Sequence, residues 1–99
     1  MLLQVRIKPR AARQIEAAVA WWSMHRHAAP GAVLNDLRSA LALLAREPGL
    51  GTPVPLDGVP VLRRLYLRRT RYFVYYRVRG GTLEVISFWH ERRGDPPPA

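Results

Sequence analysis

The first residues of the chain alternate between apolar and polar side chains. The apolar positions are Leu3, Val5 and Ile7, each two residues from the next. A period of two is typical of a β-strand with one buried face. Pro9 follows, and proline cannot donate a ladder hydrogen bond but suits the first position of a helix. The pattern therefore predicts a strand up to Lys8 that gives way to a helix at Pro9.

The next part of the chain changes to helical spacing. From Pro9 to about His25, apolar residues recur at intervals of three and four, which predicts a helix with one buried face. These residues are Ala12, Ile15, Val19 and Trp22, and the same face is widened by Trp21 and Met24. After the break A-A-P-G at residues 28–31, a second series consists of Leu34, Leu37, Leu41 and Leu44. It ends at E-P-G, residues 47–49, so two antiparallel helices are predicted.

Residues 61–90 hold three short runs rich in aromatic and branched side chains, which favour strands. The polar turn R-R-T-R at residues 68–71 separates the first two runs, and R-G-G at residues 79–81 separates the last two. A two-residue hairpin turn needs positive φ, which glycine adopts at no steric cost. The pattern predicts a three-strand antiparallel meander. The preceding residues 50–60 hold three prolines and two glycines and are predicted to be a loop with no element of its own.

The order strand, helix, helix and three strands predicts an α+β fold. In this fold both helices of a hairpin pack on one face of an antiparallel sheet, whose strand order stays open. One domain is expected over residues 1–94, because a chain of 99 residues buries enough surface to fold alone. The last residues, D-P-P-P-A at 95–99, are too rich in proline to pack and are predicted to be an extended or disordered tail.

Charge adds a first indication of function. The chain has 16 basic residues against seven acidic ones, a formal charge of +9. This favours a polyanionic partner such as nucleic acid, a ribosome or an acidic protein segment, although a GC-rich bacterial genome also explains why 15 of the 16 are arginine. The absence of cysteine excludes disulfides and favours a cytoplasmic protein. No apolar run approaches the roughly 18 residues of a membrane span, and the start is too short and polar for a signal peptide, so no membrane partner is expected.

The alternation within the predicted meander gives the sheet a dry face and a wet face. The dry face is predicted to hold Val61, Leu65, Leu67, Tyr72, Val74, Tyr76 and Val78. The wet face interleaves arginines with aromatic residues, and these are Arg64, Tyr66, Phe73, Tyr75 and Arg77. Periodicity does not decide which side of the last strand faces the helices. Aromatic residues among arginines suit stacking on exposed bases and equally suit a protein partner.

At these residues the chain resembles a known family. The run V-L-R-R-L-Y-L-R-R-T-R-Y-F-V-Y-Y-R-V from Val61, followed by G-G-T-L-E-V-I-S-F-W-H-E-R-R-G, resembles the ParE branch of the RelE/ParE toxin superfamily. These proteins are the toxin halves of bacterial type II toxin–antitoxin, or plasmid-stabilisation, systems. The resemblance implies a cognate acidic antitoxin that forms a hetero-oligomer with the toxin. It also implies two possible targets, because ParE-like members poison DNA gyrase whereas RelE-like members cleave messenger RNA in the ribosome.

The hypothesis of a ribonuclease can be weighed by its chemistry. Cleavage of RNA through its own 2′-OH needs a base, cations at the phosphorane and an acid for the leaving oxygen. His90 is the only histidine of the meander and is the candidate acid or base. A second proton-transfer group is missing, since no lysine follows Lys8 and the tyrosines suit the sheet surface. A gyrase-binding toxin without enzymatic activity is therefore preferred, with a ribosome-dependent endoribonuclease and a non-toxic basic RNA-binding domain as alternatives.

The candidate residues follow from these hypotheses. Those for binding an antitoxin or a target are Arg64, Tyr66, Phe73, Tyr75, Arg77, His90, Arg92 and Arg93. No catalytic residue is expected in a gyrase-binding toxin, whereas the metal-independent ribonuclease would use His90, Arg64, Arg71 and Arg93. No metal site or cofactor is predicted: His25 and His27 lie on different helix faces, and no glycine-rich nucleotide loop is present.

Overall fold

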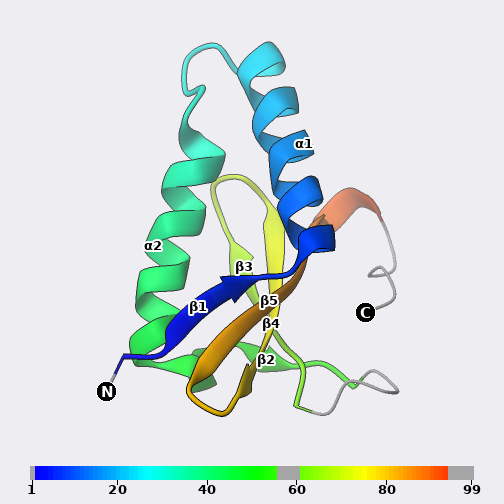
Figure 1. Cartoon of the computed structure of the whole chain (residues 1–99). Coiled ribbons are helices and arrows are strands. Elements are labelled where there is room, and N and C mark those ends of the chain that lie inside the picture. Colours follow the sequence, from blue (N-terminus) through cyan, green and yellow to red (C-terminus); the bar gives the residue numbers. More distant parts are fainter. Residues whose placement is uncertain (1, 56–60, 94–99) are drawn as a thin grey trace.

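The computed structural model describes residues 2–55 and 61–93, and it has the predicted α+β architecture (Figure 1). Two helices pack on one face of a five-stranded sheet of order β1-β5-β4-β3-β2. The elements are β1 (Gln4–Ile7), α1 (Pro9–His25), α2 (Ala32–Arg46), β2 (Thr52–Pro53), β3 (Arg63–Leu67), β4 (Tyr72–Arg79) and β5 (Thr82–His90), with 3₁₀ turns η1 (Pro48–Leu50) and η2 (Glu91–Arg93). The predicted tail, 95–99, lies outside the described residues.

The predicted meander is confirmed, but the sheet is not wholly antiparallel. Strands β3, β4 and β5 pair antiparallel, and Gly80 has the positive φ of 60° expected in the turn between Arg79 and Thr82. Strand β1 instead pairs parallel with β5. A parallel pair needs a long connection between its strands, and the two helices with the rest of the sheet provide it.

The prediction that residues 50–60 form a loop with no element of its own was wrong for the described residues 50–55. Thr52 and Pro53 form the edge strand β2, which pairs antiparallel with Arg64 and Arg63 of β3. Proline is accepted there because an edge strand has one side without ladder partners. Turn η1 precedes the strand. Both are held in place by contacts with β4, and the local sequence does not reveal these contacts. Residues 56–60 lie outside the described part of the chain.

Helix α1 begins at Pro9 and ends where the Arg26 backbone N–H donates to Trp22 O. Ile15 and Trp22 are buried as predicted, whereas Ala11 and Ala18 are buried in place of Ala12 and Val19. Trp21 and Met24, predicted to widen the apolar face, are 44% and 70% exposed. Helix α2 buries the predicted leucine face in the core.

The main core lies between the helices and the sheet, and a smaller cluster lies on the other face. The main core includes the fully buried Leu44, Val74, Tyr76, Leu83, Val85 and Phe88. The small cluster holds Leu62, Tyr75 and Ile86, so the face predicted to be wet is partly covered and Tyr75 is only 3% exposed. Val61 and Val78, predicted to be buried, are exposed, and Val61 precedes β3 with a positive φ of 58° that breaks the strand alternation.

A β-bulge explains why periodicity did not orient the last strand. Tyr75 pairs with Ser87 but Tyr76 pairs with Val85, so Ile86 has no partner in β4. The extra residue shifts the alternation by one position. Val85 therefore packs in the main core before the bulge and Phe88 after it, while Ile86 packs on the opposite face.

Among the described residues, no helix is both long enough and apolar enough to cross a bilayer. In residues 2–55 and 61–93, no group of three or more histidine, cysteine or acidic side chains is arranged to hold a metal ion.

Candidate functional site

The structure divides the predicted binding residues between two sides of the sheet. Arg64, Tyr66, Phe73, Tyr75 and Arg77 lie on the face that the helices leave free, as the pairing of β3 with β4 requires. His90, Arg92 and Arg93 line a cavity on the helix side. The sequence predicted all eight as binding candidates but left the facing of the last strand open, and the fold assigns them to two surfaces.

The helix-free face carries a row of aromatic rings across three strands. Tyr66 pairs with Phe73, and Phe73 pairs with Trp89 of β5. The Tyr66 and Phe73 ring centroids are 5.0 Å apart, and the Arg64 guanidinium lies 4.3 Å from the Phe73 ring. A cation over an aromatic face is held by the ring quadrupole. We call this surface, formed by Arg64, Tyr66, Phe73, Tyr75 and Trp89, the aromatic face.

Arg77 borders the aromatic face but already has a partner within the fold. Its Nε donates to Glu84 Oε1 at 2.7 Å, and both side chains are largely buried. This hydrogen bond lowers the pKa of Glu84 more than burial raises it. The charge of Arg77 is therefore neutralised by the neighbouring strand, which suits a structural role.

Tyr66 is hydrogen-bonded to the first residue of η2. Its hydroxyl donates to Glu91 Oε2 at 2.9 Å, and Glu91 also forms a 3.4 Å ion pair with Arg71. Burial, and then the Glu91 carboxylate, raise the pKa of Tyr66. The phenol therefore stays protonated at neutral pH and cannot serve as a base there.

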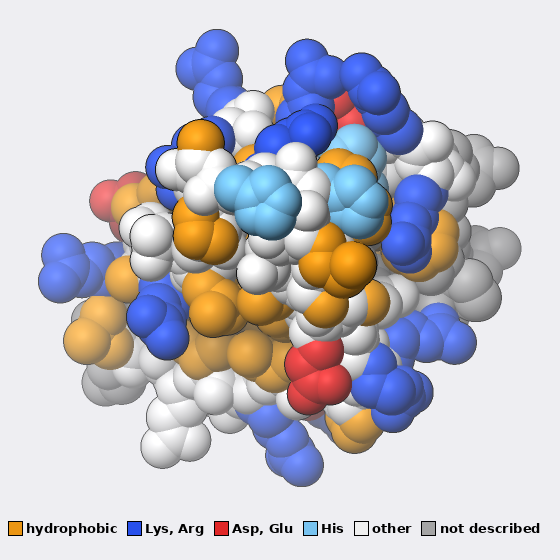
Figure 2. Space-filling view, turned by 90° about the horizontal axis from the view of Figure 1, so that it is seen from above, with side chains coloured by type: hydrophobic (Ala, Val, Ile, Leu, Met, Phe, Trp, Pro, Cys, Tyr) orange, Lys and Arg blue, Asp and Glu red, His pale blue; other side chains and the backbone are white. Residues whose placement is uncertain are grey.

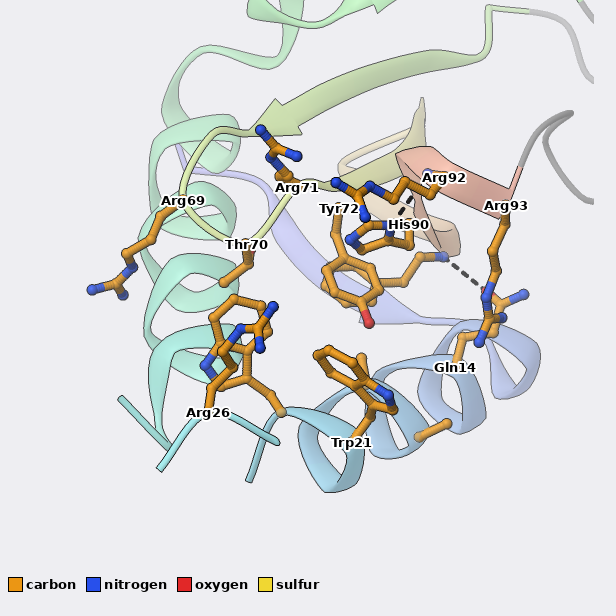
Figure 3. Close-up of a pocket in the computed structure, with 14 residues that line it drawn as sticks. Gln14, Trp21, Arg26, Arg69, Thr70, Arg71, Tyr72, His90, Arg92 and Arg93 are labelled. Carbon is orange, nitrogen blue, oxygen red and sulfur yellow. Dashed lines mark hydrogen bonds between the residues drawn. The ribbon is translucent and has the colours of Figure 1, made fainter. Parts of the chain in front are cut away.

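The cavity on the helix side is enclosed by the second half of α1, the turn 68–71 and the end of β5 with η2 (Figure 3). We call it the arginine pocket. It has a volume of about 660 Å³ and no acidic lining residue. Its lining is Gln14, Ala17, Ala18, Trp21, Trp22, Arg26, Arg69, Thr70, Arg71, Tyr72, Phe88, His90, Arg92 and Arg93.

The pocket arginines differ in how their charges are balanced. Arg69 points away from the cavity in Figure 3 and pairs with Asp36 at 2.7 Å, while Arg71 pairs with Glu91. Within the part of the chain that the structure describes, the other three have no carboxylate partner. These three are Arg26, Arg92 and Arg93. Positive charge therefore gathers around the pocket without a matching anion.

Two of these arginines rest against indole rings. The Arg26 guanidinium lies 5.4 Å from the ring of Trp21 and 5.7 Å from the ring of Trp22. The Arg93 guanidinium lies 4.9 Å from the ring of Trp89, which belongs to the aromatic face. Arg93 thus stands at the rim between the two surfaces.

The neutral ring of His90 has one free donor and no free acceptor. Its Nδ1 accepts the backbone N–H of Arg92 at 3.1 Å, so the ring proton of the neutral form sits on Nε2. Burial lowers the pKa of His90; Glu91 raises it, and the nearby charges of Arg92, Arg93 and Arg71 lower it further. At neutral pH the ring therefore has no free lone pair with which to take a proton.

Tyr72 lies beside His90 on the helix side of the sheet. Its ring stacks on Phe88 with centroids 4.5 Å apart and meets His90 edge-on at 4.9 Å. Burial raises the pKa of Tyr72 against the opposing charge of Arg93. Its phenol is therefore a donor at neutral pH, and in Figure 3 it points toward Trp21 across the cavity.

Sequence reasoning did not place Trp21, Arg26, Arg69 and Thr70 at a site. The helical pattern had assigned Trp21 to an apolar face, and neither Arg26 nor Arg69 stands in a recognisable motif. Arg26 and Thr70 are 44 residues apart, and only the packing of α1 on β5 brings them together. The available signal was the pair Trp21 and Trp22 close to an arginine at the end of the predicted helix.

Comparison with known protein families assigns this chain to one of them. A family model described as the ParE toxin of type II toxin–antitoxin system, parDE, matches residues 5–94. The chain belongs to the ParE toxin family. A comparison with curated protein sequences finds no match.

Solved structures share the fold of this ParE-family chain. The chromosomal ParDE system from P. aeruginosa superposes with a TM-score of 0.69 at 20% identity, covering 90% of this chain and 96% of that one. A mutant of the E. coli toxin RelE in the free state gives 0.65 at 18% identity, covering 95% and 88%. The toxin–antitoxin complex RelBE2 from Mycobacterium tuberculosis gives 0.61 at 21% identity, covering 92% and 100%. These values establish the superfamily fold, which both ParE and RelE proteins have.

Proposed function

We propose that this ParE-family toxin inhibits growth by binding DNA gyrase in the cytoplasm and does not cleave RNA. The observation that carries the proposal is the state of His90. Its Nδ1 lone pair is taken by the Arg92 backbone N–H and its Nε2 carries the proton of the neutral ring, so neither nitrogen is a free base. A ribonuclease that uses the substrate 2′-OH needs such a base.

The other groups near the cations also lack basic character. The phenols of Tyr66 and Tyr72 have raised pKa values, and Glu91 accepts a hydrogen bond from Tyr66 while pairing with Arg71. What the described surface supplies is exposed aromatic area and positive charge. These are the features of a protein-binding surface, where tyrosine, tryptophan and arginine carry most of the energy.

A supercoiling assay tests the proposal. Purified protein is expected to block supercoiling of relaxed plasmid by gyrase and to leave ribosome-bound message intact. Tyr66→Ala on the aromatic face should weaken the block, and Arg46→Ala, which removes a charge at the far end of α2, is the control. Message cut in the ribosome, with supercoiling unaffected, would contradict the proposal.

An acidic antitoxin is the proposed partner that keeps the toxin inactive. Two of the similar structures are named as toxin–antitoxin systems, and the formal charge of +9 favours an acidic segment. The aromatic face is the proposed docking surface, because Arg64 and Tyr66 there are accessible. Co-expression with a small acidic protein encoded beside this chain should give a stable complex and restore growth, and failure of every neighbouring acidic protein to do so would count against it.

A second candidate is a RelE-like endoribonuclease acting on ribosome-bound message. The arginine pocket favours it, because several guanidinium groups beside His90 and Tyr72 suit the charge of a phosphorane. In this alternative Arg71 and Arg93 supply cations and His90 acts as the proton-transfer group, whereas Arg64, the fourth residue predicted for it, lies on the other face of the sheet. A His90→Ala variant that remains fully toxic would remove this candidate.

A further inference from the structure

The arginine pocket has a chemical character that gyrase binding does not require. Its wall holds no anionic side chain, and its guanidinium groups, the Tyr72 phenol, the Thr70 hydroxyl and the Nε2–H of His90 can all donate hydrogen bonds. The one amide oxygen in the lining, Gln14 Oε1, already accepts the Phe88 backbone N–H at 2.8 Å. A ligand rich in negatively charged acceptors therefore suits this wall best.

We propose that the arginine pocket binds a small ligand carrying a polyphosphate group. Arg26, Arg92 and Arg93 have no carboxylate partner in the described chain, so a single carboxylate would leave most of their charge unbalanced. Two or three linked phosphates supply a matching negative charge. Guanidinium forks also fit phosphate oxygens in bidentate geometry.

One further arginine and a threonine add to the wall. The ion pair of Arg71 with Glu91 is long, at 3.4 Å, and the Arg71 side chain is 53% exposed, so the fold holds this charge weakly. Thr70 is 1% exposed, and its hydroxyl has no hydrogen-bond partner among the described residues. An unsatisfied buried hydroxyl in a wall of cations is consistent with a site whose acceptor comes from outside the chain.

The size and the apolar part of the pocket match a small molecule. Its volume of about 660 Å³ lies within the range of small-molecule sites. Ala17, Ala18 and Phe88 give an apolar floor, and Trp21, 44% exposed, stands at the rim. The polyphosphate can be inorganic or part of a nucleotide, whose base would lie against Trp21.

Calorimetry on the full chain distinguishes these sources. Sodium tripolyphosphate and ATP are titrated separately, without divalent metal and at one ionic strength. Both are expected to bind at one site, and Arg26→Ala and Arg92→Ala should each weaken binding by about tenfold. Arg46→Ala removes the same charge outside the pocket and should leave the affinity nearly unchanged. If ATP binds more tightly than tripolyphosphate and Trp21→Ala removes this difference, the ligand is a nucleotide. If the two affinities are equal, the pocket recognises the phosphate chain alone.

Three results would overturn the proposal. The first is no binding of either probe at millimolar concentration. The second is an equal loss of affinity in Arg46→Ala and Arg92→Ala, which would mean general attraction to a cationic protein. The third is a hexaglutamate peptide that binds more tightly than tripolyphosphate and is weakened by the same pocket variants, which would assign the pocket to a protein segment. Since gyrase takes no part in the titration, its outcome is independent of the proposed toxicity.

Discussion

At the scale of single residues, Tyr76 shows how one side chain fixes an edge of the sheet. It is fully buried in β4, accepts the Gly51 N–H at 2.8 Å and donates to Pro48 O at 2.6 Å. These two bonds hold η1 and β2 against the sheet. The turn therefore depends on a residue 28 positions after Pro48, and local sequence signals did not predict it.

Gly51 is required by the same contact. A Cβ at this position would collide with the Tyr76 hydroxyl and lie 2.9 Å from Arg64 O. Gly51→Ala should lower the free energy of unfolding by about 1–3 kcal/mol, because the buried ring and backbone have no room to move. Gly49→Ala is the matched control, since a Cβ there meets nothing within 4 Å. Urea denaturation compares the two variants, and an equal effect would show that Tyr76 can move aside.

The ion pair between Arg77 and Glu84 predicts a pH dependence of stability. Because the pKa of Glu84 is below its ordinary 4.5, the carboxylate contributes stability above this pH and loses it as the pH falls. Glu84→Gln should therefore be less stable than the native chain at pH 7, and the difference should shrink by pH 3. Urea denaturation across this range measures it. A difference that stays constant with pH would mean that Glu84 acts through packing.

At the scale of elements, the sequence predicted those parts that short-range periodicity specifies. Both helices and the three-strand meander follow from spacings of three, four and two. The parallel pairing of β1 with β5 and the strand β2 depend on partners far along the chain, so no local pattern contains them. The unpaired Ile86 in β5 has a similar effect, because one extra residue changes which side chains face the helices.

The candidate site was predicted in part for the same reason. The aromatic face arises from alternation within neighbouring strands, and the sequence therefore indicated Arg64, Tyr66 and Phe73. The arginine pocket joins α1 to a turn and to the end of β5, so it requires the tertiary packing. Tyr75 belongs to the predicted set but is buried, because Leu62 and Ile86 cover it.

The connection between the helices gives a test at the scale of elements. Trp22 Nε1–H donates to Ala29 O at 2.7 Å and thereby ties the end of α1 to the start of the turn. Trp22→Phe keeps an aromatic side chain but removes this hydrogen bond, leaving Ala29 O with the Ala32 N–H at 3.2 Å, so the free energy of unfolding should fall by about 0.5–1.5 kcal/mol. Trp21→Phe is the control, since Trp21 is 44% exposed and its indole N–H has no such tie. Equal stability of the two variants, measured by thermal unfolding, would show that packing alone holds the turn.

At the scale of the whole molecule, positive charge is spread widely and does not by itself mark a site. In the view of Figure 2, Lys and Arg side chains surround the end of the molecule, and Asp and Glu appear in few places. A field of this kind attracts an acidic partner from many directions. What distinguishes a binding surface is the coincidence of arginine with accessible aromatic rings, as on the aromatic face.

This distribution predicts separate effects on association and dissociation of an acidic antitoxin. Arg64→Ala on the aromatic face and Arg79→Ala at the exposed hairpin remove the same charge, so both should slow association slightly, and rising salt should slow it further. Only Arg64→Ala should speed dissociation, because it also removes a guanidinium stacked 4.3 Å from the Phe73 ring within the contact. Surface plasmon resonance at several salt concentrations measures both rates. If Arg79→Ala speeds dissociation and Arg64→Ala does not, the antitoxin docks at the hairpin end of the sheet and the aromatic face is left for the target.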